Sequence, residues 1–160
     1  MKPSLARPLA GGFLAVLVAC GGGGSSTPTA PATPVPTPTP VSYSGTYSGP
    51  MLFTSSAGTL NVIGTTTVTH SPNLVSLTNL VATTAGGSVT FPLGTAPLAG
   101  TFDGSLPYNS SGCGVITSRY HGYFGQSGTV MKMNLQVTLT PDRVTGSCGV
   151  NDIRGELTRN

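Results

Sequence analysis

The stretch "TVMKMNLQVTLT", residues Thr129–Thr140, decides the fold because its side chains alternate strictly between apolar and polar over the ten positions from Met131 to Thr140. Successive side chains of a β-strand point to opposite faces, so the alternation predicts a strand with one dry and one wet face. The apolar face holds Met131, Met133, Leu135, Val137 and Leu139. The polar face holds Lys132, Asn134, Gln136 and Thr138. A sheet with one wet face is typical of antiparallel architecture.

Weaker strand signals fill the rest of residues 42–160, where Val, Thr, Ile, Leu and Tyr are common and glycines recur. In "IRGEL", Ile153 and Leu157 face inward, and Arg154 and Glu156 face outward as a solvated pair. The other runs are Tyr43–Ser48, Leu52–Ser55, Gly58–Thr69, Leu74–Leu80, Ser88–Phe91, Leu98–Leu106, Val115–Ser118 and Tyr120–Phe124. Turns are expected at Ser71–Asn73, Gly86–Gly87, Gln126–Gly128 and Pro141–Asp142.

This pattern predicts an all-β domain of about eight to ten short antiparallel strands, with no helix. Two architectures fit: a small meander barrel of about eight strands, or a β-sandwich. We favour the barrel because closure removes exposed sheet edges. The first and last strands, around "YSGTYSG" and "IRGELTR", would then pair, and glycine inside them suits strongly bent closure strands.

The N-terminus reads as an export signal. Lys2 and Arg7 supply positive charge, and "GGFLAVLVA", Gly11–Ala19, is a short apolar core. A secretory signal needs roughly 7 to 15 apolar residues, whereas a membrane-spanning helix needs about 20. The segment is therefore expected to be removed rather than to span a bilayer.

The end of this signal, Leu17-Val18-Ala19-Cys20, resembles the lipobox of bacterial lipoproteins. The resemblance implies cleavage before Cys20 and a diacylglyceryl group on its sulfur, so that the protein is held to a membrane by lipid. Gly21 is not the aspartate that often retains such proteins at the inner membrane, which favours the outer membrane. The rest of the chain looks like small Gly- and Thr-rich β-barrel lipoproteins of unknown function. The alternative is a plain secreted protein in which Cys20 has no role.

Residues 20–41 are predicted to be a linker between the signal peptide, 1–19, and the β-domain, 42–160. "GGGGSS" has the composition of a flexible coil, and Thr27–Pro40 that of extended polyproline-like chain. Neither part has the apolar surface needed to fold alone.

Two cysteines remain besides Cys20. Cys113 and Cys148 are predicted to form a disulfide, as expected for a small exported domain. Two buried free thiols are the alternative.

Charge gives little indication of a partner. Loss of Lys2 and Arg7 with the signal leaves five basic and four acidic residues, a net charge of +1. No run of Lys or Arg exists, so nucleic-acid binding is not expected.

No catalytic or metal motif stands out. The sequence has no Gly-x-Ser-x-Gly elbow, and His70 and His121 are too few for a zinc site unless Asp103 joins them. We expect no cofactor, no metal and no enzymatic activity. A surface-tethered hydrolase with an unidentified nucleophile is the alternative.

The candidate binding residues lie in and near "RYHGYFG", Arg119–Gly125, where aromatic rings gather beside a cation. Arg and Tyr are favoured at recognition sites because they bury a large area with few rotatable bonds. The candidates are Tyr108, Arg119, Tyr120, His121, Tyr123 and Phe124. Their partner would be a protein or a small apolar ligand, and the alternative is that some of them only fill the core.

Overall fold

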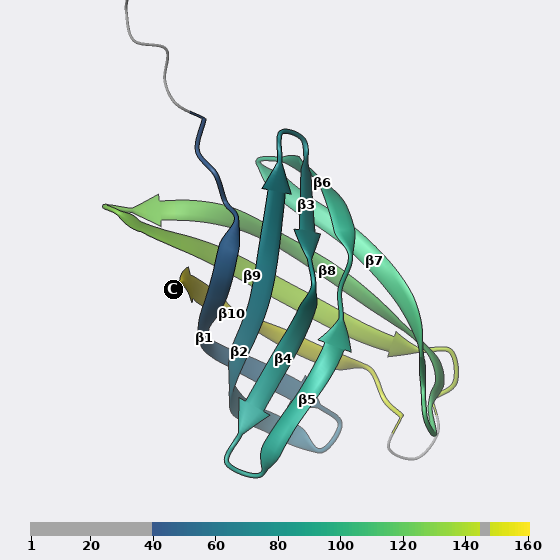
Figure 1. Ribbon diagram of the computed structural model, residues 1–160. Coiled ribbons are helices and arrows are strands. Elements are labelled where there is room, and N and C mark those ends of the chain that lie inside the picture. Colours follow the sequence, from purple (N-terminus) through teal and green to yellow (C-terminus); the bar gives the residue numbers. More distant parts are fainter. Residues whose placement is uncertain (1–39, 145–147) are drawn as a thin grey trace, which may run out of the picture. The chain divides into compact units, whose positions relative to one another are not determined.

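The computed structural model describes residues 40–144 and 148–160 (Figure 1). Cys20, the predicted signal and nearly all of the predicted linker lie outside the described residues. No helix long and apolar enough to cross a membrane occurs in the described part of the chain.

Ten β-segments make up the domain, and every pairing between them is antiparallel. They are β1 (Gly45–Ser55), β2 (Gly58–Ser71), β3 (Leu74–Leu77), β4 (Asn79–Thr84), β5 (Gly87–Pro92), β6 (Thr95–Ala99), β7 (Thr101–Ser110), β8 (Gly114–Ser127), β9 (Val130–Pro141) and β10 (Asn151–Arg159). Because β3 runs into β4 and β5 into β6 with short interruptions, the ten segments amount to a meander of about eight strands.

The first and last strands pair, as predicted. β1 lies between β10 and β2, with Phe53 opposite Ile153 on one side and opposite Leu60 on the other. The strand order β1-β10-β9-β8-β7-β6-β3-β2 therefore returns to its starting point. This confirms the meander barrel over the sandwich.

The ring of paired strands is joined by few residue pairs between β6 and β7. These two strands share two pairs, Leu98 with Phe102 and Ala99 with Thr101. Among the described residues β5 pairs with β4 alone, so β5 and β7 diverge and the sheet has the form of a half-barrel (Figure 1).

The interior is filled by the alternating apolar side chains. All five apolar residues of β9 predicted to face inward are buried, and so are Ile153 and Leu157 of β10. They pack with Tyr47, Met51, Phe102 and Tyr120 in one core cluster. Burial of this surface is the main driving force for the fold.

Residues 40–44 close one end of the half-barrel. The ring of Tyr43 stacks on that of Phe124, with centroids 4.5 Å apart. The guanidinium of Arg159 donates to the backbone oxygen of Ser42 at 3.0 Å, and the Tyr47 hydroxyl donates to that of Tyr43 at 2.8 Å.

Strand boundaries differ from the predictions at several places. β1 and β8 are each one long strand where two short runs were expected, and the Leu74–Leu80 and Leu98–Leu106 runs are each divided between two strands. The division of the Leu98–Leu106 run arises at Gly100, whose φ of 85° turns the chain between β6 and β7.

Candidate functional site

The candidate residues of β8 divide between the two faces of the sheet. Tyr120 is 2% exposed and belongs to the core, and Phe124 packs against it from the closed end. Arg119, His121 and Tyr123 lie on the opposite, outer face, as the two-residue period of a strand requires. The structure therefore brings three of the six candidates together on one surface.

The inward candidates have structural roles. A Cβ at Gly104 would overlap the Tyr120 ring, so this glycine makes room for it. Burial raises the pKa of Tyr120, and the nearby backbone of Gly94 offsets part of the rise, although the Tyr120 hydroxyl makes no hydrogen bond within the described residues. Tyr108 of β7 is half-buried, and burial raises its pKa too.

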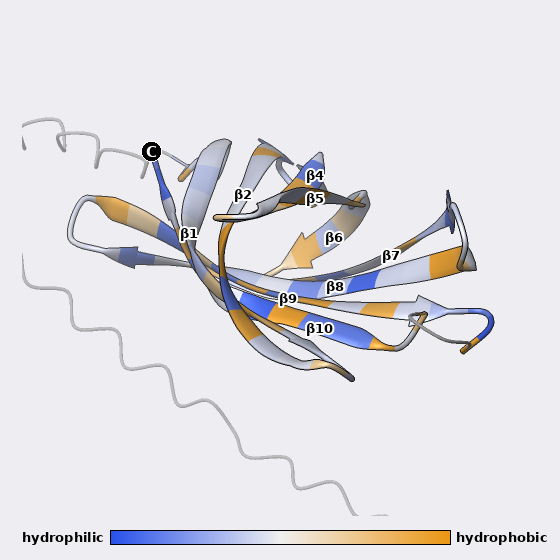
Figure 2. Cartoon of the chain, turned by 90° about the horizontal axis from the view of Figure 1, so that it is seen from below, coloured by the Kyte–Doolittle hydropathy of each residue, from blue (hydrophilic) through white to orange (hydrophobic). Residues whose placement is uncertain are grey.

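The outer face of β7–β10 gathers polar side chains in two cross-strand rows. One row runs Asp103–His121–Gln136–Arg154, and the next runs Ser105–Arg119–Thr138–Asp152. Hydrophilic segments alternate with hydrophobic ones along β8, β9 and β10 in Figure 2. This surface is built by register, because its residues come from four strands that are far apart in sequence.

Each carboxylate of this face has a partner. Asp103 Oδ1 lies 2.7 Å from His121 Nδ1. The Lys132 ammonium donates to Glu156 Oε1 at 2.6 Å. The partner of Glu156 is thus Lys132 on β9 and not Arg154. Lys132 is paired with Thr158 and reaches Glu156 diagonally across the strand pair.

The third carboxylate, that of Asp152, accepts a hydrogen bond of 2.6 Å from the Thr138 hydroxyl. These contacts hold the polar side chains of the face in fixed positions. They also leave the three carboxylates less able to attract a cationic ligand.

Three adjoining hollows cross this face, and we call them together the outer groove. The first, of about 420 Å³, lies around His121, Tyr123, Asn134, Gln136, Arg154 and Glu156. The second, of about 500 Å³, shares His121 and Gln136 with the first and adds Asp103, Ser105, Arg119 and Thr138. The third, of about 510 Å³, shares Arg119 and Thr138 and adds Thr117 and Thr140.

Glycines account for the hollow around His121. Gly122 and Gly155 face inward, on either side of Leu135 in one cross-strand row. A Cβ at Gly122 would overlap the ring of Phe102, and one at Gly155 would lie 2.9 Å from the Met51 Cα atom. Alternation of large and small inward residues is typical of small barrels. Here the absence of side chains at Gly122 and Gly155 lets the backbones of β8 and β10 lie closer to the core beneath the groove.

Two further hollows lie elsewhere on the domain. One, of about 550 Å³, is at the closed end around Tyr43, His70 and Phe124. The other, of about 390 Å³, is apolar and lies between β1–β2 and β4–β5 around Phe53, Leu60, Val89 and Phe91. The predicted small apolar ligand would fit the apolar hollow around Phe53 and Phe91 better than the polar outer groove.

The histidines do not converge. His70 packs edge-on against Tyr43, with ring centroids 4.9 Å apart, and His121 pairs with Asp103. In residues 40–144 and 148–160, no group of three His, Cys, Asp or Glu side chains could hold a metal ion.

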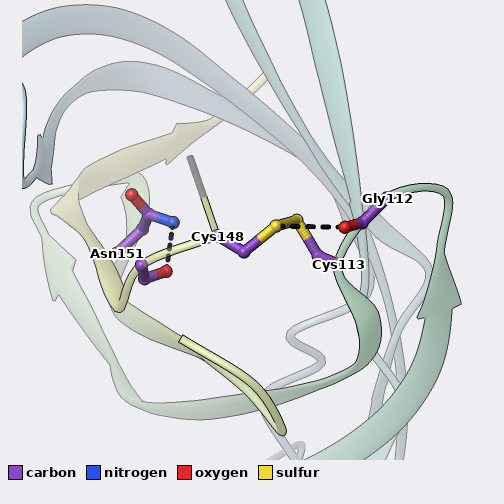
Figure 3. The surroundings of a disulfide bond; sticks show 5 residues. Gly112, Cys113, Cys148 and Asn151 are labelled. Carbon is purple, nitrogen blue, oxygen red and sulfur yellow. Dashed lines mark hydrogen bonds between the residues drawn. A yellow bond between two sulfur atoms is a disulfide. The ribbon is translucent and has the colours of Figure 1, made fainter. Parts of the chain in front are cut away.

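The predicted disulfide is confirmed. Cys113, in the turn between β7 and β8, is bonded to Cys148, ahead of β10, and their Cα atoms are 5.4 Å apart (Figure 3). The Cys148 sulfur lies 3.3 Å from the Gly112 carbonyl oxygen. This is a close contact and not a hydrogen bond, because a disulfide sulfur has no proton to donate. Asn151 donates to the Gly149 carbonyl at 2.9 Å beside it. The bond ties the β7–β8 turn to the β9–β10 connection.

Several groove residues were not named as site candidates from sequence, among them Asn134, Gln136, Thr138 and Arg154. The sequence did indicate that these residues are exposed, since they lie on the polar faces of the two clearest alternating segments, Thr129–Thr140 and "IRGEL". What was missing was the register that aligns these faces with Arg119, His121 and Tyr123. The chain matches no protein-family model, no curated protein and no solved structure, so the functional argument rests on this geometry.

Proposed function

We propose that the protein is a bacterial envelope lipoprotein, anchored through Cys20 at the outer membrane, whose β-domain is a non-enzymatic binding module. The support for the anchor is the sequence Leu17–Cys20 after a short apolar core, followed by a Gly, Ser, Thr and Pro-rich linker. Two or more acyl chains on Cys20 would hold such a protein firmly, whereas one chain gives only reversible binding.

The observation that carries the binding role is the contrast between the two sides of the sheet. Inside, bulky residues such as Tyr47, Phe102 and Tyr120 fill the core. Outside, the outer groove gathers ionisable and amide side chains held by cross-strand contacts. A domain of this construction meets its partner on its outer face, as a barrel of about eight strands has an interior just wide enough for its own side chains.

The anchor is tested by changing Cys20 to alanine and fractionating the producing cells. The expected result is loss of maturation and of sedimentation with the envelope. Ser26→Ala, in the same linker, is the matched control and should sediment normally. Unchanged maturation and sedimentation of the Cys20→Ala protein would rule out the anchor.

A surface-tethered hydrolase is the second candidate, and one observation favours it. His121 has one ring nitrogen fixed by Asp103 at 2.7 Å, the arrangement by which a carboxylate orients a histidine base. The pair is exposed to solvent, with the two side chains 52% and 73% accessible. Labelling with serine-reactive probes separates the two functions: stoichiometric labelling that a single Ser→Ala change abolishes would establish the hydrolase, and no labelling is expected of the binding module.

A further inference from the structure

Two arginines of the outer groove, unlike the lysine of the same face, make no ion pair within the described residues. Arg119 and Arg154 are exposed, and within the described residues neither has a carboxylate partner within 4.0 Å or a side-chain hydrogen bond. The ammonium of Lys132 is engaged with Glu156, and the ring of His121 contacts Asp103.

The spacing of the two arginines follows from the register. Arg119 is on β8 and Arg154 on β10, with β9 between them and an offset of one cross-strand row. Strands about 4.8 Å apart and a rise of about 3.4 Å per residue place their Cα atoms about 12 Å apart. The groove between them is lined by Gln136 and Thr138.

Charge along the groove alternates rather than accumulates. On the outer face that carries the groove, three acidic side chains, Asp103, Asp152 and Glu156, balance three basic ones, Arg119, Lys132 and Arg154. A dense polyanion would meet these carboxylates and be repelled. A ligand with acidic groups separated by neutral units would meet the arginines and avoid the carboxylates.

We infer that the outer groove binds an acidic polysaccharide in which carboxylate-bearing sugars alternate with neutral ones. This rests on the proposed binding function and names its ligand class. The planar guanidinium of each arginine matches a carboxylate in bidentate geometry. The amides of Asn134 and Gln136 and the hydroxyl of Thr140 offer both donors and acceptors to sugar hydroxyls, and the Thr138 hydroxyl, which donates to Asp152, can accept.

Tyr123 supplies the apolar contact that a sugar ring needs. Its side chain is 47% exposed at the end of the groove, next to Asn134 across the strand pair. The groove is open along three adjoining hollows, which suits an extended polymer better than an enclosed small molecule.

The experiment is calorimetric titration of the purified mature chain with hyaluronan oligosaccharides, in which every second sugar carries a carboxylate. We expect saturable binding that weakens with added salt. Exposed charge pairs are modest, so the double change Arg119→Gln and Arg154→Gln should weaken binding by about tenfold. Arg143→Gln, an exposed arginine in the β9–β10 connection, is the matched control and should bind normally.

Three results would overturn the inference. These are no binding of hyaluronan, equal binding of neutral chitin oligosaccharides, or tighter binding of poly-glutamate, which would indicate an acidic protein partner. Melting curves of each variant establish that it is folded. The result is separable from the anchor, because the Cys20→Ala fractionation does not depend on which ligand the groove takes.

Discussion

Adding a single methyl group at Gly122 tests the packing of the sheet beneath the outer groove. Gly122 is buried in β8, and the Cβ of an alanine there would overlap the backbone oxygen of Asn134 and the ring of Phe102. A backbone atom of a paired strand cannot move aside without disturbing the ladder. Overpacking of this kind costs about 1–3 kcal/mol, and the backbone clash places Gly122→Ala at about 3 kcal/mol.

The same strand offers a matched control. Gly125 is exposed, and a Cβ built there has no atom within 4 Å. Gly125→Ala should therefore be neutral or stabilise the protein by about 0.5 kcal/mol, through the smaller entropy of the unfolded chain. For a domain of this size, 1 kcal/mol corresponds to about 4 °C in melting temperature.

Thermal and urea unfolding followed by circular dichroism measure both changes. We expect Gly122→Ala to melt roughly 12 °C below the parent and Gly125→Ala within about 2 °C of it. Equal melting temperatures for the two variants would refute the alternation of large and small inward residues.

Three further predictions concern the Cys113–Cys148 disulfide, the core residue Tyr120 and the surface pair Lys132–Glu156. Replacing Cys113 and Cys148 by alanine opens a link spanning 35 residues, and the chain-entropy relation predicts a loss of about 4 kcal/mol, measured as a shift of the urea midpoint; a loss under 1 kcal/mol would contradict it. Burial raises the pKa of Tyr120 above its ordinary 10.0, so the folded protein holds this proton longer than the unfolded chain does and stability falls as the pH rises beyond about 10. Urea midpoints between pH 8 and 11 should fall less steeply for Tyr120→Phe than for the parent, and parallel curves would show that Tyr120 does not contribute. Removing the exposed Lys132–Glu156 pair by Lys132→Met should cost no more than about 1 kcal/mol, and a larger loss would show that the pair is part of the core structure.

Side-chain alternation was enough to predict the sheet and its inner face. In β9 the alternating residues from Met131 to Thr140 needed no tertiary information, because a period of two has one structural meaning over ten positions. The pairing of β1 with β10 followed from the need to remove sheet edges. The disulfide followed from counting cysteines in a domain that the N-terminal sequence predicts to be exported.

What the sequence left undetermined were features set by register. Asp103 and His121 are 18 positions apart, and they meet only because their residues pair across β7 and β8. Register depends on turn lengths, and the turn at Gly100 was hidden within an uninterrupted strand-like run. Tyr120 and His121, adjacent in sequence, were placed in one patch although the two-residue period of a strand puts them on opposite sides of the sheet.

The most direct test of the tethered binding domain is the intact mass of the protein purified from bacterial envelopes. We predict a polypeptide that begins at Cys20 and exceeds the mass of residues 20–160 by a diacylglyceryl group, with or without a further acyl chain on the amine. A chain that begins elsewhere, or one that carries no lipid mass on Cys20, would contradict the anchor.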